Sequence, residues 1–273
     1  MIGCYDYSLY YGKSLKSAED TVIAFFSRMG VVKRHRYLMN ALGRVSRLGF
    51  DSVQIFCSSP SQMPLNYKNV KELCESLGLA ISSVGSYTDI SKYYKNKDFF
   101  NNFRGVVNYA AGLETDIVCA HLGSGTMPLE DTLRTLGIMA DIAKSNGIKL
   151  ALENSPFGMA RRPEDMLFFA KNVKNLYINL DPANMLLAGG NPSEAVKALG
   201  RKIIQSHAKD AKISGSRYKF VRLGDGDVNL KEYFYELRKT GFRGHVIVEH
   251  EGSRAEESLA YGLKYMKNTI KWG

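Results

Sequence analysis

The stretch SNGIKLALENS (145–155) carries the pattern that decides the fold. Its glycine, Gly147, follows a helical pattern and supplies the left-handed backbone conformation that ends a helix at low cost. A short apolar strand then runs from 148 to 153 and ends on the carboxylate of Glu153. A helix, a glycine and a buried strand in this order are typical of one unit of an α/β protein.

The same plan recurs in RLGFDSVQIF (47–56), SLGLAISSVGS (76–86) and KTGFRGHVIVEH (239–250). Along the chain, apolar patterning predicts strands at 2–6, 52–57, 80–86, 116–121, 148–153, 176–181, 202–208 and 245–250. Helices are expected at 38–47, 67–77, 98–113, 130–145, 162–173, 192–199, 229–240 and 255–270. Strands that alternate with helices indicate right-handed crossovers and a parallel sheet.

Eight such units in 273 residues predict an α/β protein with an eight-stranded parallel (β/α)8 TIM barrel. We expect residues 1–273 to form a single domain of this kind. An open, doubly wound sheet is disfavoured because no GxGxxG follows the first strand. Residues 8–37 form an insertion after strand 1, in which Ser17 and Asp20 resemble a helix start. Whether this insertion is a lid or a structural cover stays open.

Composition limits the class of protein. The formal net charge of +10 favours anionic partners, but most lysines are scattered along amphipathic helices, as on an ordinary solvated surface. The four cysteines lie far apart without a CxxC motif, which indicates free thiols in a reducing cytoplasm. No long apolar run predicts a membrane span, and residues 1–14 lack the pattern of a secretory signal. We therefore expect a cytoplasmic protein.

Four consecutive predicted strands finish in residues that bind metal ions. They are Glu153, Asp181, His207 and Glu249. The carboxyl ends of all barrel strands meet at one mouth, where the chemistry of TIM barrels takes place. Three carboxylates and one imidazole suit one divalent cation, whereas the carboxylates alone would repel one another. The sequence therefore predicts that these four side chains hold a metal ion together.

The segments LALEN, NLDPAN, SHAKD, VRLGDGDVN and VIVEHE resemble the strand ends of the xylose-isomerase-like TIM-barrel superfamily of sugar and sugar-phosphate isomerases and epimerases. The resemblance covers most of the chain and is clearest from residue 115 onward. It implies that the four strand-end residues bind one ion, with Mn²⁺ expected first and Mg²⁺, Co²⁺ and Zn²⁺ as the other candidates. It also implies that Glu153 and Glu249 face the substrate from opposite sides. The chain departs from the family at Asn184, where a histidine is common, and at Gln54, where a glutamate is frequent.

These residues predict a metal-dependent isomerase or epimerase of a small sugar or keto-sugar, free or phosphorylated. One of the catalytic residues Glu153 and Glu249 would remove the proton α to a carbonyl and the other would return it, through a metal-stabilised enediolate. Six further residues are candidates for binding substrate: His121, Asn184, Lys209, Asp210, Arg217 and Arg222. For each of them, a purely structural role is the alternative. Lys209 and Asp210 are also candidates for positioning His207, which they closely follow.

Three alternatives stay open. The first is a lyase or dehydratase of a keto-polyol or keto-sugar, because loss of a β-hydroxyl begins with the same proton abstraction. The second is an apurinic-site DNA endonuclease. It is disfavoured because such enzymes bind three zinc ions through several histidines, and this chain has only five histidines in total. Nucleic acid is therefore also disfavoured as a partner. The third is a non-catalytic barrel subunit. The C-terminal helix with Trp272 offers a surface for a homo-oligomer.

Overall fold

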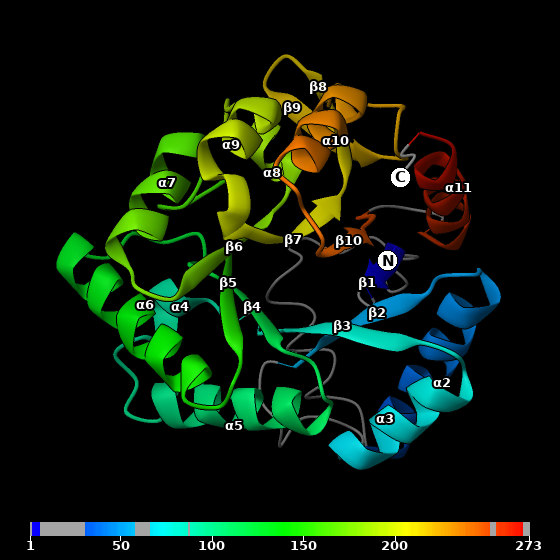
Figure 1. Ribbon diagram of the computed structural model, residues 1–273, viewed down its shortest axis with the longest axis horizontal. Coiled ribbons are helices and arrows are strands. Elements are labelled where there is room, and N and C mark those ends of the chain that lie inside the picture. Colours follow the sequence, from blue (N-terminus) through cyan, green and yellow to red (C-terminus); the bar gives the residue numbers. More distant parts are fainter. Residues whose placement is uncertain (1, 6–30, 58–65, 87, 252–254, 270–273) are drawn as a thin grey trace.

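The computed structural model describes residues 2–5, 31–57, 66–86, 88–251 and 255–269, and its strands form a closed barrel at the centre of the molecule (Figure 1). The barrel strands are β1 (Ile2–Tyr5), β2 (Ser52–Phe56), β3 (Ala80–Gly85), β4 (Ile117–His121), β5 (Lys149–Glu153), β6 (Leu176–Leu180), β7 (Ile203–Ala208) and β10 (His245–Val248). All neighbouring pairs are parallel. The predicted fold class is therefore confirmed.

The barrel closes where its first strand meets its last. Gly3 of β1 lies opposite Ser52 of β2 on one side and Ile247 of β10 on the other. Around the ring the strand order is β1-β10-β7-β6-β5-β4-β3-β2. The strands that end in Glu153, Asp181, His207 and Glu249 are thus four consecutive neighbours, and their carboxyl ends open on one side.

Helices surround the barrel on its outside (Figure 1). They are α2 (Val31–Arg47), α3 (Tyr67–Ser76), α4 (Ile90–Tyr93), α5 (Phe99–Gly112), α6 (Leu129–Lys144), α7 (Pro163–Asn172), α8 (Pro182–Leu187), α9 (Pro192–Leu199), α10 (Leu230–Lys239) and α11 (Ala255–Thr269), with a 3-10 turn at Gly200–Lys202. Most bounds lie within one residue of those expected. The expected start of the first helix at residue 38 is wrong, because α2 begins at Val31. The short helices α4 and α8 have too few turns to leave a periodic pattern, and we did not predict them.

The glycines of the repeated pattern end helices as expected. Gly49, Gly78, Gly147 and Gly241 have φ angles of 85°, 67°, 72° and 78°. A side chain with a Cβ atom is strained in this left-handed region. Each glycine therefore turns the chain from the end of one helix toward the next strand.

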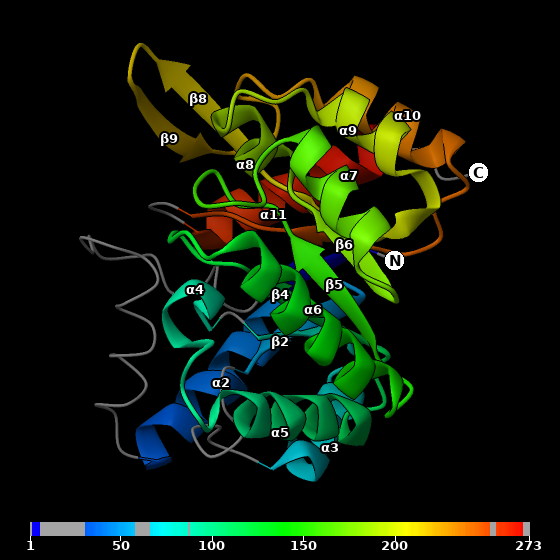
Figure 2. The same cartoon turned by 90° about the vertical axis from the view of Figure 1, so that its left-hand side faces the viewer.

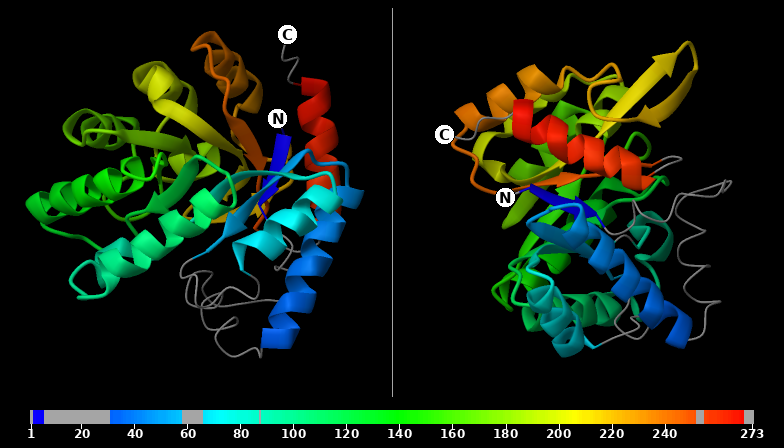
Figure 3. Two further views of the ribbon diagram at one scale, coloured as in Figure 1. Left: turned by 60° about the horizontal axis from the view of Figure 1, so that its bottom comes forward. Right: turned by 90° about the vertical axis from the view of Figure 1, so that its right-hand side faces the viewer.

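A β-hairpin, β8 (Asp210–Ser214) with β9 (Arg217–Val221), follows β7 and projects beyond the surrounding helices (Figures 2 and 3). We did not predict these two strands from the sequence. In the hairpin, Ile213 pairs with Tyr218 and Lys212 pairs with Lys219. Successive pairs lie on opposite faces, so one face of the hairpin carries the apolar pair and the other carries the two lysines. Gly215, with φ of 58°, lies at its turn.

The barrel interior contains buried polar side chains. Gln205 of β7 donates a hydrogen bond to the Sγ of Cys119 on β4 at 3.2 Å. These two strands are not neighbours, so the contact crosses the inside of the barrel. The main apolar core lies instead between the strands and the outer helices, where Leu136 and Met139 of α6 are buried. Among the described residues, Cys57, Cys74 and Cys119 are buried thiols that form no disulfide, as predicted.

Two expectations fall partly or wholly outside the described residues. Most of the insertion predicted at 8–37 lies there, including Ser17 and Asp20, while residues 31–37 belong to α2. Trp272, named as part of a surface for a partner subunit, also lies outside.

Among the described helices, none has both the length and the apolar composition that crossing a bilayer requires.

Candidate metal centre

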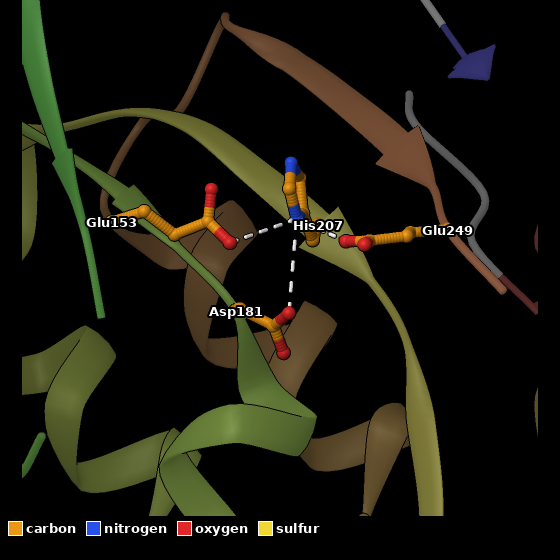
Figure 4. Close-up of side chains that lie close together, drawn as sticks. All are labelled: Glu153, Asp181, His207 and Glu249. Carbon is orange, nitrogen blue, oxygen red and sulfur yellow. Dashed lines mark ion pairs between the residues drawn. The ribbon is translucent and has the colours of Figure 1, made fainter. Parts of the chain in front are cut away.

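The four strand-end side chains meet at the mouth of the barrel (Figure 4). Glu153 is the last residue of β5, and His207 lies near the end of β7. Asp181 directly follows β6, and Glu249 directly follows β10. Along each strand, alternate side chains face the interior, so residues near four neighbouring strand ends can converge on one point. All four residues are buried.

Distances within the cluster centre on the imidazole of His207. Its Nδ1 lies 2.7 Å from Glu249 Oε2, 3.5 Å from Glu153 Oε1 and 3.7 Å from Asp181 Oδ2. One potential ligand atom from each of the four residues lies within 4.8 Å of the others. Ligand atoms bound at about 2.0–2.2 Å to one ion span roughly 4 Å across it. Small side-chain adjustments are therefore enough for the four atoms to coordinate one ion.

The donor set and its polar atoms fit a divalent cation. Asp181 Oδ2 and Glu249 Oε2 are buried and accept no hydrogen bond of good geometry within the described part of the chain. A buried carboxylate oxygen without such a partner is costly, and a bound cation removes that cost. Three carboxylate oxygens and one imidazole nitrogen form a ligand set suited to Mn²⁺, Zn²⁺ or a similar ion.

The electrostatics of the cluster favour positive charge at the same place. Burial lowers the pKa of His207, but the carboxylates of Glu153 and Glu249 outweigh this effect and raise it well above its usual value. For Glu249, burial alone would raise the pKa of the carboxyl group. The positive charges of Lys209 and His207 outweigh burial and lower this pKa to about 2. The cluster therefore carries a negative field that a metal ion would neutralise.

Lys209, a candidate for positioning His207, lies directly beside the cluster and contacts two of its carboxylates. Its Nζ is 3.3 Å from Glu249 Oε1 and 3.5 Å from Asp181 Oδ2, and it forms a very short contact with Glu251. The ring of Phe220, on the hairpin, covers the ammonium group with its centroid 4.4 Å away. Lys209 thus holds the outer oxygen of Glu249 while Oε2 faces His207.

Glu251 is a member of this network that the sequence analysis missed. Burial raises its pKa to about 7, although Lys209 acts in the opposite direction. Its spacing was a usable signal, because residues two apart on an extended chain point to the same side, and Glu251 is two residues after Glu249.

Asparagine side chains fix the backbone of Asp181. Asn154 accepts a hydrogen bond from the Asp181 N–H at 2.8 Å and donates one to its carbonyl oxygen at 2.9 Å. The N–H of Asn184 donates to Asp181 Oδ1 at 2.9 Å, so Asp181 caps the N-terminus of α8. The Asn184 side chain donates to the carbonyl oxygen of Asn154 at 3.2 Å. This candidate substrate ligand is therefore engaged in holding the loop that carries Asp181.

His121 lies next to the cluster at the end of β4. In the parallel register it is opposite Glu153. Its Nδ1 accepts a hydrogen bond from the N–H of Gly123 at 3.0 Å. This contact fixes the ring orientation and makes Nε2 the nitrogen that carries the proton in the neutral form. His121 therefore lies beside Glu153, and its role in substrate binding stays a prediction.

Asp210 points into the turn that follows the hairpin. Its carboxylate accepts four hydrogen bonds from backbone N–H groups, at 2.9 Å from Ala211, 2.9 Å from Gly224, 3.0 Å from Gly226 and 3.2 Å from Val228. These contacts tie the two ends of the hairpin segment together. The structure thus places Asp210 in a loop-anchoring position, with no contact to the ligand atoms of the cluster among those bonds.

The anchoring position of Asp210 predicts a change in stability. Asp210→Ala leaves four N–H groups without their acceptor, so we expect the free energy of unfolding to fall by about 2–4 kcal/mol. Urea denaturation would measure this loss. The control is Asp225→Ala in the same turn, which removes the exposed ion pair with Arg222 and should cost less than about 1 kcal/mol. Equal losses in the two variants would contradict the anchoring role.

The two candidate arginines lie on the hairpin and the turn after it. Arg217 is the exposed first residue of β9. Arg222 forms an ion pair with Asp225 at 2.8 Å and stacks on the ring of Tyr261 at 4.6 Å. Both of these Arg222 contacts hold it at the surface.

Comparison with known proteins gives several relatives. The uncharacterized protein MJ1311 of Methanocaldococcus jannaschii is 27% identical over 242 residues, a match that covers 80% of each chain. The 3-dehydroshikimate dehydratase of Pseudomonas putida is 24% identical over 250 residues, which are 83% of this chain and 39% of that enzyme.

Solved structures share the fold. The IolI protein with a bound zinc atom is superimposable with a TM-score of 0.76 and 18% identity, covering 98% of this chain and 97% of the other. A D-tagatose 3-epimerase-like protein has a TM-score of 0.70 and 22% identity, with coverage of 98% and 97%. A family model described as xylose isomerase-like TIM barrel matches residues 42–269. The strand-end cluster, the closed barrel and this match lead to one conclusion: the chain belongs to the xylose isomerase-like TIM-barrel family.

Proposed function

We propose that this chain is a divalent-metal-dependent isomerase or epimerase of a small sugar or keto-sugar. The observation that carries the proposal is the placement of two glutamates on opposite sides of the His207 imidazole, with Asp181 between them (Figure 4). A D-tagatose 3-epimerase-like protein and an L-ribulose 3-epimerase are among the proteins of similar fold, which supports the same class of reaction.

The residues that would hold the ion are Glu153, Asp181, His207 and Glu249. A divalent cation in this place would supply Lewis-acid polarisation of a substrate carbonyl, which lowers the barrier to losing the neighbouring proton.

Two carboxylates would then move the proton. One of Glu153 and Glu249 takes it from the carbon α to the carbonyl, and the other returns it to the adjacent carbon or to the opposite face of the same carbon. Glu153 and Glu249 lie on opposite sides of the cluster, which suits removal of the proton by one and its return by the other. Lys209 contacts Oε1 of Glu249, and Asn179 contacts Oε2 of Glu153, so each carboxylate is held in place by a neighbour.

Proton exchange with solvent tests the proposal. The chain loaded with Mn²⁺, Zn²⁺ or Co²⁺ would be incubated in D₂O with D-allulose, D-tagatose and L-ribulose. We expect deuterium to enter at a carbon next to the carbonyl, together with conversion to an epimer or isomer, both followed by ¹H NMR. Sugars that keep all their protons with every ion would argue against this function.

A dehydratase is the second candidate, favoured by the match to the 3-dehydroshikimate dehydratase of P. putida. Removal of the same α-proton, followed by loss of a β-hydroxyl as water, needs the same metal and base. Adding 3-dehydroshikimate to the panel separates the two, because elimination creates a new double bond with ultraviolet absorbance and epimerisation does not.

The endonuclease alternative gains no support from the cluster. In the part of the chain that the structure describes, His, Cys, Asp and Glu side chains form a single group close enough to hold an ion. A three-zinc site needs several further ligands around that group.

A further inference from the structure

We infer that Asn179 is a positioning residue, which holds Glu153 beside His207 in the orientation that ion binding requires. This inference rests on the proposed metal centre. Asn179 lies in β6 and is fully buried. Its Nδ2 donates a hydrogen bond to Glu153 Oε2 at 2.7 Å and lies 3.2 Å from Nε2 of His207. One amide group therefore touches two of the four candidate ligands.

The atoms that Asn179 touches are the outer ones. Glu153 Oε1 and His207 Nδ1 face each other at 3.5 Å within the cluster. Asn179 contacts the other oxygen of the glutamate and the other nitrogen of the imidazole. The bond to Oε2 fixes the torsion of the Glu153 carboxylate and leaves Oε1 to the ion.

An amide suits this position better than a charged group. Nε2 of His207 donates or accepts a hydrogen bond depending on which ring nitrogen carries the proton. The Nδ2 group of Asn179 is a donor, so it bonds to the ring only in the form whose Nε2 carries no proton, whereas its bond to the Glu153 carboxylate does not depend on the ring. An uncharged donor holds this carboxylate without adding a positive charge that would compete with the ion.

The strand register brings Asn179 to this place. It lies opposite Glu153 of β5 on one side and Gln205 of β7 on the other. Between Ile178 and Asn179 the pairing with β7 shifts by one residue. Since a one-residue shift reverses which side chains face the interior, this irregularity allows Asn179 and His207 to face the same space.

Metal affinity in two variants tests the inference. Asn179→Leu keeps the branched shape of the side chain and removes both contacts, and Asn179→Ser is a smaller replacement that keeps a polar group. We expect Zn²⁺ and Co²⁺ to bind to each variant about 10–100-fold more weakly than to the wild-type protein in calorimetric titrations. The visible absorption of bound Co²⁺, which reports coordination geometry, should also change. Circular dichroism of the metal-free proteins would confirm that they are folded.

Gln205→Met is the matched control. Gln205 is a buried amide at the same level of the barrel, and its hydrogen bond goes to Cys119, not to a ligand. We expect this variant to bind Co²⁺ with wild-type affinity and spectrum. Wild-type affinity and spectrum in the folded Asn179 variants would overturn the inference, as would equal losses in Gln205→Met. A wild-type chain that binds the ions but converts no sugar would contradict the proposed reaction and leave this inference intact.

Discussion

Glu153→Gln and Glu249→Gln are each expected to lower turnover by at least about a thousandfold, within the range of effects known for general acid–base groups. Glutamine keeps the shape of the side chain and an oxygen that can face an ion, but it cannot accept the proton from a substrate carbon. The loss should therefore appear in kcat while the fold stays intact. Conversion of the sugar that wild-type protein epimerises, followed by NMR, would measure it.

The control for this pair is Glu194→Gln on the outer helix α9, where the carboxylate pairs with Lys197 at the surface. This variant should turn over substrate at the wild-type rate. An active Glu153→Gln or Glu249→Gln protein would remove that glutamate from its proton-transfer role. Deuterium exchange separates the two roles, because the variant that lacks the first base exchanges no proton at all.

Metal loading is expected to raise the melting temperature strongly. An ion that binds only the folded chain, present at 1,000 times its dissociation constant, stabilises the fold by about 4 kcal/mol. For a chain of this length the shift should be roughly 10 °C. Calorimetric melting with EDTA, and then with excess Mn²⁺ or Zn²⁺, would measure it.

In Asp181→Ala the same additions should leave the melting temperature nearly unchanged, because the site has lost a ligand. Asp210→Ala is the control, since its carboxylate holds a backbone turn, and it should keep the full metal-dependent shift from a lower starting temperature. A shift of equal size in Asp181→Ala would place the ion elsewhere on the chain.

The four cluster residues could be predicted because the ends of buried strands can be recognised in the sequence. A run of apolar residues that stops on a charged group marks the end of a buried strand, and the parallel barrel brings all such ends to one mouth. Gly147 and Gly241 marked the preceding helix ends, which fixed where those strands begin. The positions of Glu153 and Glu249 therefore followed from the local pattern.

The contacts that support the cluster residues were harder to predict from the sequence, because they depend on strand register and on the course of the loops. The position of Asn179 between two ligands depends on an irregular pairing of β6 with β7, and no local pattern marks that irregularity. Asp210 was expected near substrate, but its carboxylate serves four N–H groups in a turn formed by residues up to 18 positions later. Lys209 was expected to position His207, but its contacts go to Glu249, Asp181 and Glu251, and the contact with Glu251 depends on how the chain leaves β10.

The most direct test of the account is the metal content of the purified chain. Wild-type protein and Asp181→Ala would be prepared without chelators, soaked with Mn²⁺ or Zn²⁺, desalted and measured by elemental analysis. We expect about one ion per wild-type chain and almost none in the variant, since four ligands converge on one point and Asp181 supplies one of them. A wild-type chain without metal after both treatments, or one that holds three zinc ions, would contradict it.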